Sequence, residues 1–201
     1  MGSTFCKVVV YLLECEQKFQ PGTKLHALHK YVKATLKRTL GAENLHEAVR
    51  LPDGEDLNEW IAVNTIDFFN TISLLYGSMS EFCTAESCPI MSAGPRFEYQ
   101  WADGVKQKRP KRCSAPEYVE HLMSWVQSEL DNTELFPTQI GVPFRTDFKD
   151  RCRNIMRRLF RVYAHLYHHH LEHVVGCGAE PHLNTCFKVL TIMFPQSDTL
   201  Y

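Results

Sequence analysis

The sequence feature that most constrains the fold is a long stretch with helical periodicity at residues 146–173. Apolar side chains recur there every three or four positions, so they line one face of an α-helix. The stripe consists of Phe148, Cys152, Ile155, Leu159, Val162 and Leu166. Such a helix must bury its stripe against other elements, because a single helix cannot cover its own apolar face. We therefore expect the other elements to pack around it, and we expect it to be the longest helix.

Further segments of the chain show the same periodicity. Helices are predicted at residues 24–40, 57–76 and 116–130, and a last one from near Pro181 to about Phe194. The segment RFEYQWADGVKQKR alternates in character and then meets an Asp-Gly step, which predicts a short hairpin. The predicted fold class is mostly α: a helical bundle around a long central helix, with one short β-hairpin.

The composition argues against several classes of protein. A chain of 201 residues with 44% hydrophobic residues fits one soluble globular domain. The net charge of -1 gives no reason to expect nucleic acid as a partner. No apolar run approaches the roughly 18–20 residues that a transmembrane helix needs. The eight cysteines come without a recognisable secretion signal, so we expect thiols or metal ligands in a reducing compartment.

Two remote segments together have the composition of a metal site. Cys83 and Cys88 form a C-x4-C pair, and a histidine-rich stretch downstream contains His165, His168, His169, His170 and His173. Two thiolates and two imidazoles would make a closed, tetrahedral, structural zinc site. Spacing alone does not choose the histidines. On a straight helix it favours His165 with His168 or His169, whereas His165 and His170 meet only if the helix distorts or ends.

Arginines recur on the same predicted helix, opposite its apolar stripe. Arg153, Arg157 and Arg161 are four residues apart, and Arg158 lies beside them. One guanidinium group can donate two parallel hydrogen bonds to a phosphate, so this cluster suits a phosphate or an acidic peptide. The plainer interpretation is the solvated polar face of a surface helix, and composition alone favours it.

Acidic residues gather just before the helix predicted at residues 57–76. They are Asp53, Glu55, Asp56 and Glu59, beside Trp60. Carboxylates at the start of a helix interact favourably with its dipole, which is sufficient to explain them. The functional alternative is a negative patch for a basic partner.

Six blocks of the sequence, in order, resemble successive motifs of the Mob/phocein family, and most of all its founding class. They are LPDGEDLNEWIAVNTIDFFN, LLYGSMSEFCTAESCPIMSAGPRFEYQWADG, CSAPEYVEHLMSWVQ, LFPTQIGVPF, RRLFRVYAHLYHHH and HLNTCFK. The resemblance covers roughly residues 45–188. It implies a mostly helical, non-catalytic kinase activator and adaptor. Such a protein binds NDR/LATS-type AGC kinases and phosphorylated Ste20-like kinases in signalling of the Hippo or mitotic-exit type, in the cytoplasm and also in the nucleus.

The resemblance also implies roles for individual residues. It places a structural Zn2+ ion on Cys83, Cys88, His165 and His170. It assigns phosphopeptide binding to Arg157, Arg158 and Arg161. It assigns kinase binding to Glu55, Asp56, Glu59 and Trp60. A regulatory phosphorylation site aligns with Thr35 or Thr39.

The two ends of the chain depart from the family pattern. Residues 1–23 form a divergent N-terminal segment, with Lys18 where a phosphorylatable Thr is expected. The family-type helical domain is expected over residues 24–201, with its C-terminal helix truncated, because the sequence diverges after the HLNTCFK block.

Two other functions stay open as alternatives. A zinc hydrolase would need an open metal position and a nearby general base, and two Cys with two His would instead fill the coordination shell. A scaffold subunit of a phosphatase or vesicle-traffic complex would act without activating an NDR/LATS kinase. Binding of such a kinase to the acidic patch would separate this scaffold from the kinase activator.

Overall fold

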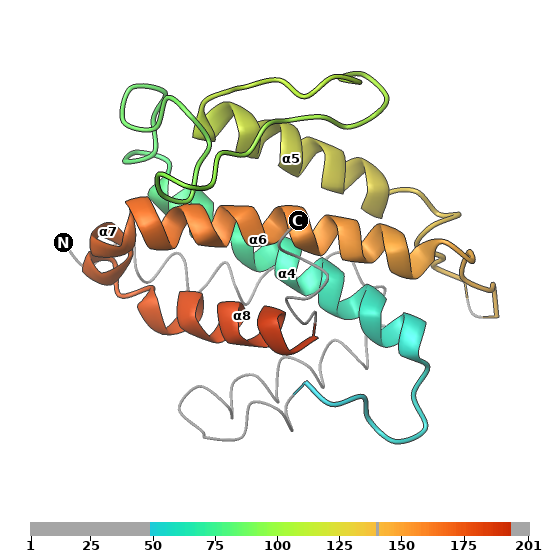
Figure 1. The fold of residues 1–201 in the computed structure, drawn as a ribbon. Helices are drawn as coiled ribbons and strands as arrows, with labels where there is room; N and C mark the ends of the chain where they lie inside the picture. Colours follow the sequence, from blue (N-terminus) through green and yellow to red (C-terminus); the bar gives the residue numbers. More distant parts are fainter. Residues whose placement is uncertain (1–48, 140, 194–201) are drawn as a thin grey trace.

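A computed structural model describes residues 49–139 and 141–193, and those residues form five helices. They are α4 (Leu57–Met79), α5 (Ala115–Leu130), α6 (Phe148–His169), α7 (Leu171–Gly176) and α8 (Glu180–Met193) (Figure 1). The helix predicted at residues 24–40, the candidate phosphorylation sites Thr35 and Thr39, and the two chain ends lie outside the described residues.

The helices pack side by side, and α6 contacts each of the other four. In Figure 1, α5 and α8 lie on opposite sides of α6, and α4 crosses behind it. The prediction of a mostly helical fold is therefore confirmed. None of the described helices combines the length and apolar character required to span a membrane.

The helix predicted over residues 146–173 differs from the observed one. α6 ends at His169, because His170 leaves the helical region with φ -130° and ψ 13°. The short α7 then turns the chain, and α8 returns along α6 (Figure 1). Among the described helices α4 has 23 residues and α6 has 22, so the expectation that this helix is the longest was wrong.

Side-chain caps explain where two helices begin. The Asp56 carboxylate accepts hydrogen bonds from the backbone N–H groups of Asn58 and Glu59, which fixes the start of α4. The Ser114 hydroxyl accepts from the Glu117 N–H at the start of α5, where Pro116 fits the first turn. Both starts lie within one residue of the predicted ones.

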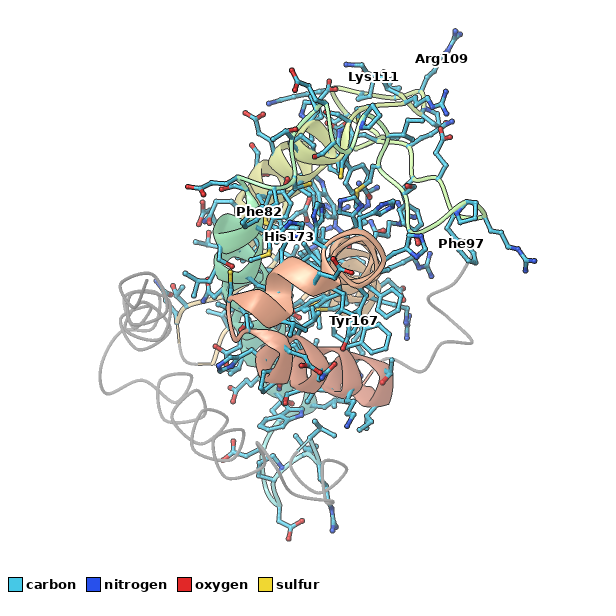
Figure 2. All side chains as sticks on the ribbon, turned by 90° about the vertical axis from the view of Figure 1, so that its left-hand side faces the viewer. Phe82, Phe97, Arg109, Lys111, Tyr167 and His173 are labelled. Atoms are coloured by element: carbon cyan, nitrogen blue, oxygen red, sulfur yellow. The ribbon has the colours of Figure 1, made fainter. Side chains whose placement is uncertain are left out.

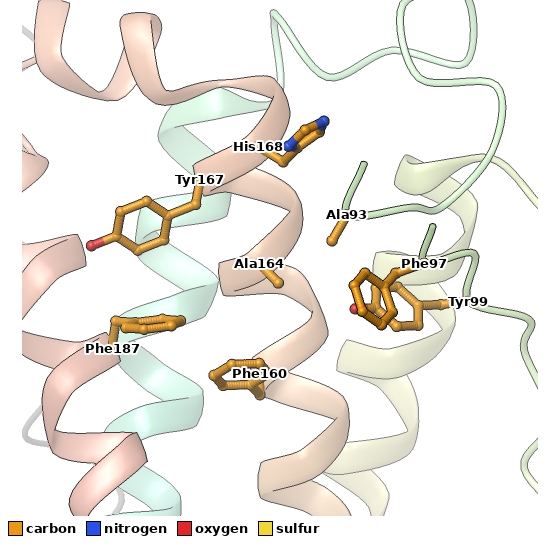
Figure 3. Close-up of a pocket in the computed structure, with 8 residues that line it drawn as sticks. All are labelled: Ala93, Phe97, Tyr99, Phe160, Ala164, Tyr167, His168 and Phe187. Atoms are coloured by element: carbon orange, nitrogen blue, oxygen red, sulfur yellow. The ribbon is translucent and has the colours of Figure 1, made fainter. Parts of the chain in front are cut away.

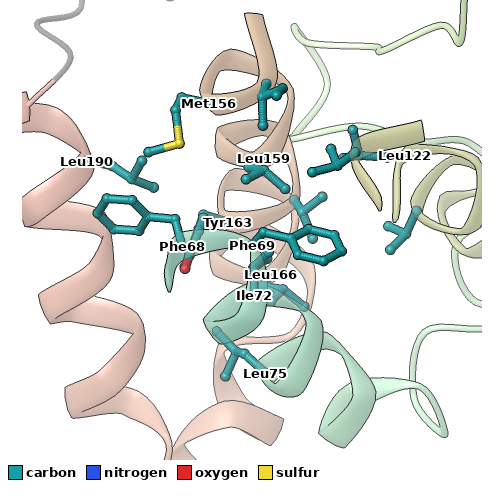
Figure 4. Close-up of a cluster of buried hydrophobic side chains, with 14 of the residues drawn as sticks. Phe68, Phe69, Ile72, Leu75, Leu122, Met156, Leu159, Tyr163, Leu166 and Leu190 are labelled. Carbon is teal, nitrogen blue, oxygen red and sulfur yellow. The ribbon is translucent and has the colours of Figure 1, made fainter. Parts of the chain in front are cut away.

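The core lies between α4 and α6 and is closed on either side by α5 and α8 (Figure 4). Ile72 of α4 and Leu159 of α6 are fully buried, and Leu122 and Leu190 approach from α5 and α8. Each such side chain contributes about 1.5–3 kcal/mol by leaving water. This packing fixes α6 against the end of α4, and the candidate site lies at that end.

The predicted hairpin is not confirmed. Among the described residues, antiparallel pairing is limited to two isolated bridges, Ser92 with Glu98 and Trp101 with Lys111. The turn does occur at the Asp-Gly step, where Gly104 has φ +80°. The Asp103 carboxylate accepts hydrogen bonds from the N–H groups of Val105 and Gln107, so a local loop stands where strand pairs were expected.

Candidate metal centre

The two cysteines of the C-x4-C pair lie on the loop that follows α4. The Cys83 N–H donates to the Met79 carbonyl at 2.9 Å, so Cys83 continues the last turn of the helix. The Cys88 N–H donates to the Thr84 carbonyl, also at 2.9 Å, which closes a second turn. Both thiols are buried, with exposed fractions of 2% and 5%. The local fold therefore directs both sulfur atoms inward.

The two histidines come from the end of α6. His165 is fully buried, and its Nδ1 lies 2.8 Å from the Ser92 carbonyl oxygen. A carbonyl can only accept, so Nδ1 carries the proton and donates, which leaves the Nε2 lone pair for a ligand. Nε2 lies 3.4 Å from Cys83 Sγ. His170, at the break after α6, places its Nε2 3.3 Å from Cys88 Sγ.

These four side chains meet in one buried cluster. One ligand atom from each of Cys83, Cys88, His165 and His170 lies within 4.8 Å of all the others. Tetrahedral bonds of about 2.3 Å to sulfur and about 2.0 Å to nitrogen would separate sulfur from nitrogen by about 3.5 Å. The observed sulfur–nitrogen distances of 3.4 and 3.3 Å agree with that value. The residues present therefore fit a metal ion, and the Ser92 carbonyl orients one of its ligands.

Burial disfavours charge on three of the four side chains of this cluster. It raises the pKa of the Cys83 thiol to about 12. It lowers the pKa of His165 to about 4, and it also lowers the pKa of His170. At neutral pH the imidazoles are therefore unprotonated and ready to bind a metal, whereas Cys83 must lose a proton when a metal binds.

The end of α6 decides which histidines take part. Residues five apart on a straight helix diverge, but the break at His170 turns its ring back toward Cys88. His169 instead places Nε2 3.1 Å from the Ser92 hydroxyl, and His168 packs against Gly94. The preference from spacing for His168 or His169 was therefore wrong, and the structure brings His165 and His170 together.

Neighbouring contacts of the cluster were missed from the sequence. The Tyr76 hydroxyl donates to Cys83 Sγ, and the Ser92 carbonyl accepts from His165. His173 of α7 stacks on Phe82 with ring centroids 4.1 Å apart, and Figure 2 labels both residues near the end of α6. No motif marks such residues, because each contact depends on how the loop of residues 80–95 folds over the end of α6.

The arginine cluster of α6 lies against aromatic rings. The Arg158 guanidinium carbon is 5.1 Å from the ring centroid of Trp101 and 4.5 Å from that of Trp125, and burial lowers the pKa of Arg158. Arg161 lies over Tyr99 at 5.2 Å. Stacking of this kind holds a guanidinium by its face and leaves edge N–H groups for an anion.

Hydrogen bonding fixes the cluster further. Arg161 Nη1 donates to the Tyr118 hydroxyl at 3.0 Å. Arg157 is half-buried on the same helix. The aromatic partners come from the loop before α5 and from α5 itself, and sequence analysis did not connect them with the arginines.

An aromatic groove adjoins the arginine cluster. It has a volume of about 510 Å³ and lies over α6, between the loop of residues 93–99 and α8 (Figure 3). Its lining residues are Ala93, Phe97, Tyr99, Phe160, Ala164, Tyr167, His168 and Phe187. Tyr99 lines the groove, and Arg161 lies over the Tyr99 ring, so the groove and the arginine cluster are continuous.

The acidic turn lies at the other end of α4 from the cysteines. Asp56 is exposed, while Glu55 and Glu59 are half-buried. Trp60, the aromatic residue of the expected kinase-binding set, is only 3% exposed. The surface available at this turn is therefore acidic, with Trp60 beneath it. The rise of α4 separates this turn from the metal centre by about 35 Å.

Comparison with known proteins identifies the family of the chain. A sequence model of the Mob1/phocein family matches residues 37–197. MOB kinase activator-like 1A of Arabidopsis thaliana is 56% identical over 167 residues, which cover 83% of this chain and 76% of that protein. MOB kinase activator-like 1 homolog B of Dictyostelium discoideum is 57% identical over 170 residues, which cover 85% and 77% respectively. The chain belongs to the Mob1/phocein family.

Proposed function

We propose that this chain is a non-catalytic kinase activator and adaptor with a structural Zn2+ ion. The observation that carries the proposal is the arrangement of two recognition surfaces on a helical body closed by a Cys2His2 cluster. Family membership supports this proposal, and so do the relatives, which are named kinase activator-like proteins. The site of action is the cytoplasm, with the nucleus as a second location.

Zinc suits the donor set of the cluster. Two thiolates and two imidazoles at tetrahedral spacing are a common structural zinc site. Zn2+ would neutralise two buried thiolates and would hold the loop after α4 against the end of α6. Because all four positions are taken by side chains, this site leaves no place for a metal-bound water, which favours a structural role over hydrolysis.

The arginine cluster serves as the phosphopeptide site. Arg158 and Arg161 are positioned in advance by Trp101, Trp125 and Tyr99, so little side-chain entropy is lost when they bind phosphate. The adjoining groove offers an apolar surface for a side chain next to the phosphorylated residue. We assign the ligand to a phosphorylated Ste20-like upstream kinase.

The acidic turn serves as the kinase-binding site. Glu55, Asp56 and Glu59 would attract the basic N-terminal segment of an NDR/LATS-type kinase. Binding that favours the active arrangement of the kinase would increase the population of that arrangement. The two surfaces lie on different parts of the molecule, so both kinases can be held together.

A binding experiment tests the phosphopeptide site. A phosphothreonine peptide from a Ste20-like kinase is titrated against the chain and against Arg161→Ala, with fluorescence anisotropy as the readout. We expect Arg161→Ala to weaken binding by about tenfold or more, because a charged hydrogen bond is lost. Arg153→Ala is the matched control, since Arg153 binds Asp150 on the same helix at 2.6 Å. Equal affinity for the unphosphorylated peptide would contradict the assignment.

A second experiment tests the kinase-binding site. Glu55→Lys should weaken binding of an NDR/LATS-type kinase segment, and the loss should be larger at low salt than at high salt, because salt screens exposed charges. Binding that does not depend on salt would contradict an electrostatic contact at this turn. A wild-type chain that does not bind these kinases would support the scaffold function.

A further inference from the structure

One hydroxyl group reaches a sulfur atom of the cluster from the body of α4. The Tyr76 hydroxyl lies 3.5 Å from Cys83 Sγ and donates to it. This sulfur also faces His165 Nε2 at 3.4 Å and the Cys88 thiol, which would itself be a thiolate in the metal-bound centre. Neutral Nε2 would bind the metal, so Tyr76 is the group left to donate a hydrogen bond to a metal-bound Cys83 thiolate.

Within residues 49–139 and 141–193, the hydroxyl nearest to the second cysteine is a weaker donor. The Ser87 hydroxyl lies 3.8 Å from Cys88 Sγ, but it lies only 2.7 Å from the Phe82 carbonyl oxygen. A serine hydroxyl has one proton, and the shorter, better acceptor takes it. Ser87 therefore shapes the loop, while Tyr76 contacts a ligand atom directly.

We propose that Tyr76 is a positioning residue of the metal centre, which stabilises the metal-bound Cys83 thiolate and links α4 to the ion. This inference rests on the metal centre of the proposed function. Hydrogen bonds to the ligands of a metal commonly affect metal affinity by about 10–100-fold. Cys83 follows Tyr76 by seven residues and lies beyond the end of α4, where its N–H bond to the Met79 carbonyl holds it against the last turn of the helix.

The link has a structural consequence. Tyr76 lies in α4 next to Leu75, which is buried in the core. Cys83 lies in the loop that follows α4. The Tyr76 hydrogen bond therefore joins the ion to the helix that carries the acidic turn at its other end.

The test uses the full-length chain produced with Co2+ in place of zinc. Tyr76→Phe keeps the half-buried ring and removes only the hydroxyl. We expect the sulfur-to-cobalt charge-transfer band to move to longer wavelength, because a thiolate without its hydrogen bond gives up electron density more easily. We also expect the metal to be lost to excess chelator about 10–100 times faster.

Two control variants separate this role from general effects of lost hydroxyls. Ser78→Ala removes a hydroxyl from the same end of α4 that bonds the Leu75 carbonyl, and Thr71→Ala removes one nearer the middle of this helix that bonds the Asp67 carbonyl. Neither should move the charge-transfer band. A Tyr76→Phe spectrum and release rate equal to those of the wild-type chain would overturn the role of Tyr76. A wild-type chain without a tetrahedral cobalt spectrum would overturn the metal centre itself.

Discussion

His165 shows at the scale of one residue how burial prepares a ligand. The imidazole is fully buried, and that burial lowers its pKa to about 4. The Ser92 carbonyl accepts a hydrogen bond from His165 Nδ1–H, and this bond leaves Nε2 as the nitrogen that faces Cys83. His165 is therefore neutral and oriented before a metal ion binds. This lowers the free-energy cost of binding the ion.

This burial predicts how stability depends on pH. The pKa of His165 is lower in the folded chain than its ordinary value of 6.5, so the unfolded chain takes up the proton first as pH falls. The stabilisation is fully present above about pH 6.5 and is lost progressively toward pH 4, at about 1.4 kcal/mol per unit of pKa difference. Bound metal does not change the sign, because protons compete with the ion for the same nitrogen.

Urea unfolding at a series of pH values measures this effect. The free energy of unfolding should fall steadily as the pH is lowered from about 6.5 toward about 4.5. A free energy that stays constant or rises over that range would show that His165 is not held neutral by burial.

At the scale of the elements, α4 connects two features that the sequence places far apart. Its first turn is capped by Asp56 among the acidic residues, and its last turn continues to Cys83. The capping carboxylate is therefore already engaged with the backbone. A partner that binds this turn would share Asp56 with the helix itself.

Substitutions at Asp56 separate capping from recognition. Asp56→Ala removes the acceptor of two N–H groups and should destabilise the chain by about 1 kcal/mol. Asp56→Ser keeps a capping oxygen and should preserve most of the stability. Both variants remove the charge, so both should weaken binding of the basic kinase segment. The measurements are urea unfolding and binding; equal destabilisation by Ala and Ser would contradict the capping role.

The elements also show what the sequence could predict. The periodicity at residues 57–76 and 116–130 gave α4 and α5 within a few residues, because long apolar stripes leave little choice of structure. The hairpin was not confirmed, because the Asp103 carboxylate accepts hydrogen bonds from backbone N–H groups within a loop, where strand pairs were expected. Alternation over a few residues cannot distinguish these outcomes.

The candidate site was predictable in its ligand types and less so in its members. Two cysteines and a histidine-rich helix indicate a metal site, and the family resemblance gave His170. Spacing alone favoured other histidines, because it assumes that α6 stays straight through His170. The Ser92 contact could not be predicted, since it arises when the loop after α4 folds over α6, and the Tyr76 contact depends on the turn that holds Cys83 against the end of α4.

At the scale of the whole molecule, an ion bound by the Cys2His2 cluster would fasten the loop after α4 to the end of α6. The core packs α4, α5, α6 and α8 through apolar side chains. The loop after α4 contains Cys83 and Cys88, with exposed residues between them, and it contributes little apolar area of its own. An ion present at 1,000 times its dissociation constant would stabilise the folded chain by about 4 kcal/mol.

The most direct measurement is the metal content of the purified chain, determined by elemental mass spectrometry against protein concentration. We expect one zinc ion per chain, and we expect Cys83→Ser to lose it, because a serine hydroxyl cannot replace a thiolate ligand. Cys177→Ser is the control, since this half-buried cysteine lies outside the cluster. A wild-type chain without metal, or a Cys83→Ser chain that retains a full equivalent, would contradict the Cys2His2 centre.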